Sequence, residues 1–350
     1  MTGTKTVGAE VPTVDRTHIG VTPGVFWAPD ITACVGFTPL VKIRKLTIQH
    51  GVKCTVLAKP EFMNPTGSVK DRMAVWVLND AVQNGVLKPG GTIIEATSGN
   101  TGAAVAMFAA AHGYKAILTV PDKMSNEKID AIRAFGARVL VCPTAVPAES
   151  QENYYQVAKR LHQETPNSFF LEQYQNTKNI DSHYYTTGPE IWDQTGGRID
   201  CLVGGIGTGG TVSGIARFLK EKNPNIQVVA ADPYGSIYYQ FHKDKTVVEP
   251  HTYLVEGIGE DMVCDSIDMS VIDMVYQVND RECFDMGIEL TRTEGLFAGG
   301  SSGAAMSVAL KHAKTLSPDK IVVVILPDGG GKYVSKMYND EWMKAKNMRP

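Results

Sequence analysis

The stretch Gly204-Gly205-Ile206-Gly207-Thr208-Gly209-Gly210-Thr211 (GGIGTGGT) indicates which fold class to expect. It follows the apolar run 201–203 and precedes residues 211–222, whose apolar spacing is helical. A glycine-rich turn between a strand and a helix lets backbone N–H groups point into one concavity, and the helix adds the positive end of its dipole. We expect an anion there. The residues alone leave open a dinucleotide, another phosphate-containing ligand or a structural turn.

Short β-branched runs alternate with helix-length segments along the whole chain. We expect buried strands at 54–59, 92–96, 116–120, 138–142, 201–206, 227–232 and 321–327, and helices at 101–112, 125–134, 151–163, 211–222, 282–293 and 302–313. This order predicts an α/β fold with mainly parallel sheets. The polar, aromatic and weakly periodic stretch 165–190 is predicted to cross between two domains and to form a wall of the site.

Composition narrows the class of partner. The chain has 350 residues, 43% of them hydrophobic, and its 34 basic and 37 acidic residues are interspersed, with a net charge of −3. This balance gives no basic surface for nucleic acid or membrane headgroups and favours a small ligand. No run approaches the roughly 18 apolar residues of a membrane span, and the N-terminus lacks a signal-peptide core, so we expect a cytoplasmic protein. The six cysteines are expected to be reduced core residues, and the eight histidines show no metal-ligand spacing.

A second polar loop, residues 64–72 (NPTGSVKDR), lies between an expected strand and an expected helix. Lys70 falls in the first turn of that helix, where the helix dipole disfavours a cation. The loop is either a solvated charged face or a site whose dry surroundings lower the pKa of the Lys70 amine. In the second case Lys70 could form a Schiff base.

Two further loops precede helices. In residues 97–102 (TSGNTG) hydroxyl and N–H groups suit a carboxylate, although simple N-capping by Ser98 or Thr101 is the alternative. Residues 299–303 (GGSSG) match a hydrolase nucleophile elbow, but His312 is the only later histidine and no Asp or Glu lies between the serine and His312, so a hydrolase is not expected. Pyridoxal phosphate would use all four loops, because it needs a lysine, a phosphate cradle, a partner for its ring nitrogen and a substrate-carboxylate site.

From about Thr38 to about Trp342 the chain resembles fold-type II pyridoxal-phosphate enzymes of the cysteine synthase and cystathionine β-synthase family. The segments 59–72 (KPEFMNPTGSVKDR), 93–102 (IIEATSGNTG), GGIGTGGT and GGSSG occur in the family's order at similar spacings. The resemblance implies a tryptophan synthase β-like fold with two three-layer α/β domains and the cofactor in the cleft between them. The smaller domain would span 42–178 and the larger one 12–41 plus 179–350, in a homodimer.

The resemblance also implies a role for each matching residue. Lys70 would be the Schiff-base lysine, Asn100 would bond the 3′-oxygen of the ring, and Ser301 would face the pyridine nitrogen. The phosphate would be held by Gly207, Thr208, Gly209, Gly210 and Thr211. The substrate α-carboxylate would be held by Thr97, Ser98, Thr101 and Gln173, with Gly257 in a loop that closes over the amino acid.

The implied reaction is a β-replacement on serine or an activated serine through an α-aminoacrylate, with a thiol acceptor. A neutral serine beside the ring nitrogen makes the ring a moderate electron sink, which favours β-elimination over racemisation or transamination. Segments 121–125, 232–237 and 256–259 look closer to cystathionine β-synthase than to O-acetylserine sulfhydrylase, which favours homocysteine as acceptor and cystathionine as product. The alternatives are a cysteine synthase using O-acetylserine and sulfide, a cysteine or serine β-lyase releasing hydrogen sulfide, and an NAD-dependent oxidoreductase.

The chain departs from the family's pattern near the expected entrance for the second substrate. Glu260 stands where animal members have tyrosine, and residues 329–331 are glycines where bulkier residues are expected. Glu260 either attracts the ammonium group of homocysteine or is a solvated loop residue. No haem is expected, because His18 precedes Cys34, the reverse of the order in animal relatives. Asp232, which imitates a ribose-binding acid, is expected to be a turn residue if the ligand is pyridoxal phosphate.

Overall fold

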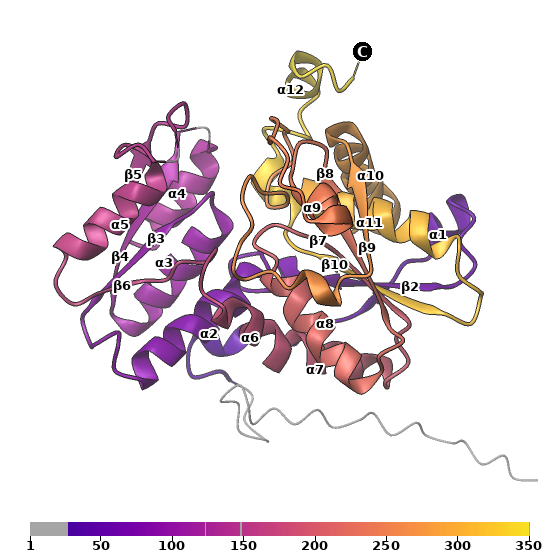
Figure 1. Cartoon of the computed structure of the whole chain (residues 1–350), viewed down its shortest axis with the longest axis horizontal. Coiled ribbons are helices and arrows are strands. Elements are labelled where there is room, and N and C mark those ends of the chain that lie inside the picture. Colours follow the sequence, from indigo (N-terminus) through magenta and orange to yellow (C-terminus); the bar gives the residue numbers. More distant parts are fainter. Residues whose placement is uncertain (1–26, 123, 148, 350) are drawn as a thin grey trace, which may run out of the picture.

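The computed structural model describes residues 27–122, 124–147 and 149–349, which form two sheets, each covered by helices (Figure 1). The strands are β1 (Val41–Lys42), β2 (Thr55–Pro60), β3 (Thr92–Ala96), β4 (Lys115–Pro121), β5 (Arg138–Cys142), β6 (Ser168–Phe170), β7 (Cys201–Gly205), β8 (Gln227–Pro233), β9 (Met274–Val278) and β10 (Ile321–Leu326). The helices are α1 (Lys45–Gln49), α2 (Lys70–Gln83), α3 (Asn100–His112), α4 (Asn126–Ala134), α5 (Tyr154–Glu164), α6 (Lys178–Tyr185), α7 (Thr187–Thr195), α8 (Gly210–Lys222), α9 (Tyr238–Asp244), α10 (Asp280–Glu294), α11 (Gly300–Ala313) and α12 (Asp340–Ala345). The predicted α/β class with two parallel-rich sheets is confirmed.

The six-stranded sheet has the order β1-β2-β10-β7-β8-β9 and is parallel except for the β1–β2 pair. Its two central strands, β10 and β7, carry no polar side chain, because both of their faces are covered by helices. Val322 and Val324 of β10 face a core shared with α10 and α11, whereas Val323 faces a core shared with α7 and α8. The alternation of side chains along one strand therefore builds two cores and a three-layer arrangement.

The four-stranded sheet has the order β5-β4-β3-β6, and all its pairs are parallel. Ile93 of β3 packs in a core with side chains of α2, α3 and α4. Its neighbour Ile94 faces the opposite side, where it packs with Ala158 of α5 and Phe170 of β6. This smaller group of elements thus has three layers as well.

Sheet membership differs from the predicted domain division at one strand. The predicted smaller domain, 42–178, includes β2, yet β2 pairs with β10 from Thr55 to Pro60 inside the six-stranded sheet. The reason is packing, because Val56 and Ala58 fill the core beneath α11. The boundaries 42–178 and 12–41 plus 179–350 remain a prediction.

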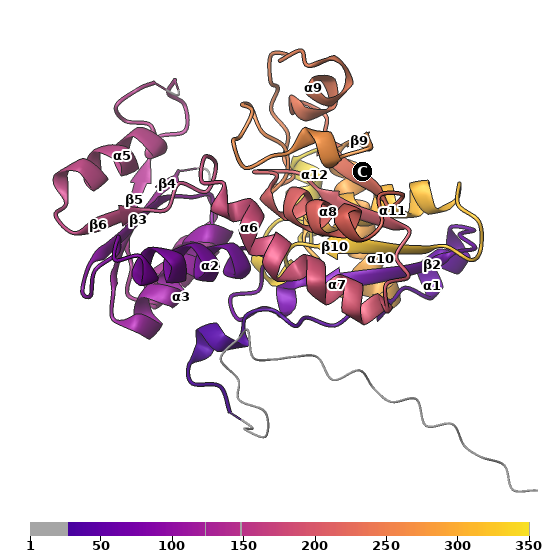
Figure 2. The same ribbon diagram turned by 60° about the horizontal axis from the view of Figure 1, so that its bottom comes forward.

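The stretch 165–190 is more regular than its sequence predicts. It contains β6, all of α6 and the start of α7, and α6 packs against both α2 and α8 between the two groups of elements (Figure 2). Three buried residues of α6 are polar, namely Asn179, Ser182 and His183. A helix that buries polar side chains shows no apolar stripe, which explains the missed prediction.

The cysteines and the surface agree with most of the compositional expectations. Five of the six free cysteines are buried, but Cys34 is exposed in a short 3-10 turn and corrects the prediction for that residue. His18, on which the haem prediction depends, lies outside the described residues. Within the described ranges, none of the helices has the length and apolar character needed to cross a membrane.

Candidate active site

Four helices begin around one pocket at the carboxyl edge of the six-stranded sheet. Lys70 is the first residue of α2, Asn100 is the first of α3, and Thr211 and Ser301 lie in the first turns of α8 and α11. The pocket encloses about 520 Å³ of open space, with solvent at its mouth included. Of the predicted site residues it is lined by Lys70, Asn100, Gly207, Thr208, Gly209, Thr211, Gly257 and Ser301. α2 and α8 come after β2 and β7, whose carboxyl ends lie at one edge of the six-stranded sheet, whereas Asn100 comes from the loop after β3 of the four-stranded sheet.

The glycine-rich loop offers unpaired donors to this pocket. The backbone N–H groups of residues 207–211 donate to no acceptor within the described parts of the chain. The last two of these residues begin α8. Gly209 has φ +88°, and a Cβ there would lie 2.4 Å from Ile267 Cβ, so only glycine fits. Unpaired N–H groups at the start of a 13-residue helix suit an anion.

Two side chains of α6 hold the hydroxyls of the loop from behind. Asn179 Nδ2 donates to Thr208 Oγ1 at 3.1 Å, and His183 Nε2 lies 3.1 Å from Thr211 Oγ1. Asn179 and His183 are both buried. Sequence reasoning missed both residues, since nothing in the spacing of residues 178–185 links them to residues 208–211.

Lys70 is a half-buried amine facing the pocket. Within the described ranges its Nζ has no hydrogen-bond or ion-pair partner. Burial lowers the pKa of Lys70 from its usual value, while the charges of Glu260, Cys264 and Asp328 oppose that shift. A lysine with a lowered pKa has more of the neutral form that acts as nucleophile and base.

Asn100 is held at both ends of its amide. Its Nδ2 donates to Asp328 Oδ2 at 2.8 Å, and its Oδ1 accepts from Lys332 Nζ at 2.6 Å. Tyr333 donates to the same Asp328 oxygen at 2.6 Å. Because an amide nitrogen carries two protons, one donor of Asn100 remains for a ligand oxygen. Asp328 was not predicted, although its place two residues after β10, at the carboxyl end of a parallel strand, is a signal that could have found it.

Ser301 and Ser302 differ in their surroundings. Ser301 is buried, lines the pocket, and has its Oγ 3.5 Å from Asp328 Oδ1. Ser302 donates to the backbone oxygen of Asp328 at 2.9 Å. His312, which a hydrolase would need as its base, instead lies 2.9 Å from Gln227 Oε1. No serine–histidine pair is present in this loop of the described structure, in line with the rejection of a hydrolase.

The residues predicted to hold the substrate carboxylate lie beside the pocket. Thr97 Oγ1 accepts the N–H groups of Gly99 and Gly102, both at 3.1 Å, and Thr101 Oγ1 donates to Gln173 Oε1 at 2.6 Å. Ser98 is exposed in the same loop. Thr97, Ser98, Thr101, Gln173 and Gly210 are absent from the pocket lining. The roles assigned to these residues, like those assigned to the pocket-lining residues, remain predictions.

Comparison with known proteins identifies the family. The family model described as "Pyridoxal-phosphate dependent enzyme" matches residues 31–328. The chain belongs to this family. It is 48% identical to a cystathionine beta-synthase of Apis mellifera over 91% of this chain and 63% of that protein, so it spans less than two thirds of that relative. It is 41% identical to an O-acetylserine dependent cystathionine beta-synthase of Bacillus subtilis over 88% of this chain and 96% of that one. A crystal structure of an O-ureido-L-serine synthase superposes with a TM-score of 0.81 at 33% identity, covering 91% of this chain and 99% of that one.

The pocket of this pyridoxal-phosphate dependent enzyme fits its cofactor. The unpaired N–H groups of residues 207–211 suit a phosphate, and the amine of Lys70 suits an aldehyde. The amide of Asn100 and the hydroxyl of Ser301 lie on the same pocket and can meet a ring oxygen and a ring nitrogen. Family membership implies pyridoxal phosphate, rather than a dinucleotide, as the cofactor of this chain, and the assignment of GGIGTGGT to its phosphate stays a prediction.

Two features flagged in the sequence gain local explanations. Asp232 is buried at the end of β8, and its Oδ2 accepts the N–H of Tyr239 at 2.8 Å; burial raises its pKa to about 6. Gly330 is packed against an aromatic ring, and a Cβ there would lie 2.4 Å from the ring of Phe297. A bulkier residue at 330 would displace that ring.

An ionic contact joins the two groups of elements beside the pocket. Lys128 of α4 pairs with Glu256, and Lys336 Nζ pairs with the other Glu256 oxygen at 2.6 Å. The Lys128 side chain also crosses Gly99, where a Cβ would lie 2.8 Å from Lys128 Cδ. Because Glu256 precedes Gly257, this contact ties the pocket-lining loop to the loop that carries Asn100.

Proposed function

We propose that the protein catalyses β-replacement on serine or an activated serine with a thiol acceptor, with homocysteine as acceptor and cystathionine as product. The observation that carries this proposal is the unpartnered amine of Lys70, which shares one pocket with an N–H cradle and a buried neutral serine, Ser301. The names of the Apis mellifera and Bacillus subtilis relatives support the same reaction class.

Each pocket residue has a part in binding the cofactor. Bound pyridoxal phosphate supplies an aldehyde carbon and an electron-withdrawing ring. Lys70 would hold the aldehyde carbon, and the loop Gly207-Thr208-Gly209-Gly210-Thr211 would bind the phosphate at the N-terminus of α8. The spare N–H of Asn100 would meet the ring 3′-oxygen, with its amide kept in place by Asp328 and Lys332.

Lys70 also has the properties of a general base. Its Nζ would take the proton from the substrate α-carbon, since burial lowers its pKa and so increases the share of unprotonated amine. Ser301 would offer only a neutral hydroxyl to the ring nitrogen, so proton transfer to that nitrogen is not provided by this side chain. This combination favours loss of a β-substituent over transamination.

The substrate carboxylate would bind at the start of α3. Thr97, Ser98 and Thr101 belong to the loop and first turn of that helix, and Gln173 is tied to Thr101 by a 2.6 Å hydrogen bond. Gly257, with φ +85°, would close over the amino acid from the opposite side. Glu260, three residues later, would attract the ammonium group of an amino-acid thiol.

The reaction has two rivals within the family. A cysteine synthase would use O-acetylserine and sulfide, and a β-lyase would release hydrogen sulfide or water without a second amino acid. Purified enzyme given serine or O-acetylserine, each with homocysteine or sulfide, separates them by product. We expect cystathionine as the main product. Cysteine from O-acetylserine and sulfide, or pyruvate in every mixture, would overturn the proposal in favour of the first or the second rival.

The assembly and location are part of the same proposal. A homodimer is what the resemblance implies, and sedimentation at micromolar concentration distinguishes it from a monomer. A cytoplasmic location is supported by six cysteines that form no disulfide. Fractionation of the source cells tests that location.

A further inference from the structure

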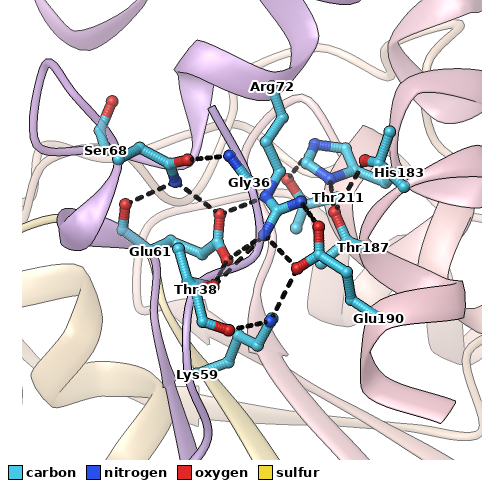
Figure 3. A network of polar contacts seen from close by, with 12 residues as sticks. Gly36, Thr38, Lys59, Glu61, Ser68, Arg72, His183, Thr187, Glu190 and Thr211 are labelled. Atoms are coloured by element: carbon cyan, nitrogen blue, oxygen red, sulfur yellow. Dashed lines mark hydrogen bonds and ion pairs between the residues drawn. The ribbon is translucent and has the colours of Figure 1, made fainter. Parts of the chain in front are cut away.

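His183 of α6 is a buried histidine with a hydrogen-bond contact at each ring nitrogen. Its Nδ1 lies 2.8 Å from Thr187 Oγ1, and its Nε2 lies 3.1 Å from Thr211 Oγ1 (Figure 3). Thr187 begins α7, whereas Thr211 belongs to the N–H cradle at the start of α8. The imidazole thus connects the phosphate-binding loop to the helix pair behind it.

The imidazole of His183 is neutral in this environment. Burial, and then the positive charge of Arg72, lowers the pKa of His183 to about 3. Arg72 remains charged, because Glu61 and Glu190 bind its guanidinium with contacts of 2.6 Å. A neutral imidazole has one N–H donor and one acceptor nitrogen, so His183 can donate to only one of its two threonines.

The neighbouring hydroxyls favour one of the two tautomers. Thr186 Oγ1 donates to the backbone oxygen of Ser182 at 2.5 Å, so its own proton is already used. Of these two hydroxyls only Thr187 therefore has a proton to give, and its Oγ1 lies closer to His183 Nδ1, at 2.8 Å, than to Thr186 Oγ1, at 3.4 Å. The shorter contact favours donation from Thr187 to Nδ1. His183 then carries its proton on Nε2 and donates to Thr211.

The direction of the hydrogen bonds from Thr187 through His183 to Thr211 decides whether Thr211 can donate to an anion. A phosphate dianion accepts hydrogen bonds only, so Thr211 must donate its own proton towards the phosphate. If Thr211 instead donated to His183, its oxygen lone pairs would face the anion. When Thr211 Oγ1 accepts a hydrogen bond from His183 Nε2–H, the proton of the Thr211 hydroxyl remains available for the phosphate.

We propose that His183 is a positioning residue, which as the Nε2–H tautomer orients the Thr211 hydroxyl as a donor to the cofactor phosphate. This inference rests on the proposed assignment of residues 207–211 as the phosphate cradle. Thr187, His183 and Thr211 then form one ordered chain of donors that ends at the phosphate. His183 acts through Thr211 and touches neither substrate nor ring.

The tautomer can be read in the unmutated holoenzyme. In histidine labelled with ¹⁵N, two-bond correlations distinguish Nε2–H from Nδ1–H, and the signal of His183 is the one that moves in the Thr211→Val variant. We expect Nε2–H when pyridoxal phosphate is bound. An Nδ1–H tautomer in the holoenzyme would overturn the inference without any further variant.

A double-mutant cycle tests the mechanism. His183→Phe removes the donor, and we expect it to weaken pyridoxal phosphate binding about tenfold, the usual order for a hydrogen bond that orients a donor to a charged group. His183→Gln, whose amide can reach Thr211, should restore most of the affinity. In a Thr211→Val background, His183→Phe should have no further effect, and the ³¹P shift of the bound cofactor should change only where Thr211 is present.

His312→Phe is the matched control, because His312 is also buried and bonded on both ring nitrogens, to Gln227 and Tyr276. It should lower stability while leaving cofactor affinity unchanged. Equal losses from His183→Phe in both Thr211 backgrounds would mean a purely structural role and would refute the inference, while the proposed β-replacement would stand. A wild-type protein that binds no pyridoxal phosphate would refute the proposed function itself, and the inference with it.

Discussion

Lys59 and Lys70 lie eleven residues apart and are both removed from bulk water, yet their surroundings differ. Lys59 Nζ contacts Glu190 Oε2 at 2.9 Å, Thr38 O at 2.6 Å and Gln194 Oε1 at 3.0 Å. Lys70 Nζ has no such partner within the described ranges and faces the pocket. One lysine has all three of its donors occupied, and the other has its donors available.

The region around Lys59 is a closed ionic network (Figure 3). Arg72 binds Glu61 through Nε and Glu190 through Nη1, each at 2.6 Å. Burial alone would raise the pKa of Glu190, but Arg72 and Lys59 lower it to about 2. A buried charge with a full set of partners stabilises a particular packing, whereas a buried charge without partners at a pocket indicates chemistry. The difference predicts opposite outcomes for mutations at the two places.

Loss of Lys70 gives the largest effect that we expect. Lys70→Ala removes both the covalent attachment of the cofactor and the base, so we expect kcat to fall by about 10³-fold or more. The borohydride-reducible, covalently bound cofactor should disappear, as measured by absorbance and mass spectrometry. Chemical unfolding should not show the loss expected when a buried ion pair is broken, because Lys70 Nζ has no ion-pair partner within the described ranges.

The control is Lys222→Ala, at an exposed position near the end of α8. Its activity and colour should match the wild type. If Lys70→Ala retained a borohydride-reducible cofactor bond, the assignment of Lys70 as the Schiff-base lysine would be wrong. The proposed difference in function between Lys59 and Lys70 would then be wrong as well.

Opening the ionic network should instead damage the fold. Arg72→Leu leaves Glu61 buried without its cation and Glu190 with Lys59 as its remaining one, and breaking a buried pair in this way costs about 3–5 kcal/mol. Denaturant titration of the holoenzyme measures the loss. Arg217→Leu, which breaks a pair with Asp268 at the surface, should cost about 1 kcal/mol or less. Equal losses in the two variants would show that burial does not distinguish these ion pairs.

The fold class could be predicted because its signals are local. The runs that form β7 and β10 are apolar along their whole length, as expected of strands covered on both faces, and β3 and β8 are buried and mostly apolar. β1, β6 and β9 are short or only partly buried, and α6 is rich in buried polar residues, so their patterns were weak. The place of β2 depends on pairing with β10, more than 260 residues later, which no local pattern contains.

The candidate site was predictable where a residue belongs to a loop motif. Lys70, Asn100 and Ser301 each lie in the first turn of a helix after a recognisable glycine-rich or polar loop, and the structure brings them to one pocket. His183 and Asp328 stand in no motif, since they act by contact with a loop from another part of the chain. Sequence spacing identifies residues that face a ligand better than residues that support them.

A smaller loss of stability is expected from Lys59→Met. Glu190 keeps Arg72 as a partner, so only the Lys59 contacts disappear, and the methionine can fill much of the space. We expect a loss of about 1–3 kcal/mol with kcat unchanged, measured by denaturant titration alongside the steady-state rate. Lys220→Met, at a surface pair with Asp273, is the control. A loss of activity without a loss of stability would give Lys59 the role assigned to Lys70.

The smallest effect concerns Lys70 in protein stripped of cofactor. Because burial lowers the pKa of Lys70 below its usual value of 10.5 in the folded state, the unfolded chain binds the extra proton between the two pKa values. Wild-type stability should therefore rise with pH across that window, and the penalty for burying a charged amine is complete below it. Lys70→Met buries no charged amine, so its free energy of unfolding at neutral pH should exceed that of the wild type by about 0.5–2 kcal/mol, the range of single stabilising changes. The gain should shrink as pH approaches 10.5, which thermal unfolding over a pH series measures against Lys222→Met. A gain that does not vary with pH would mean that packing, rather than the unpartnered charge of Lys70, separates the two lysines.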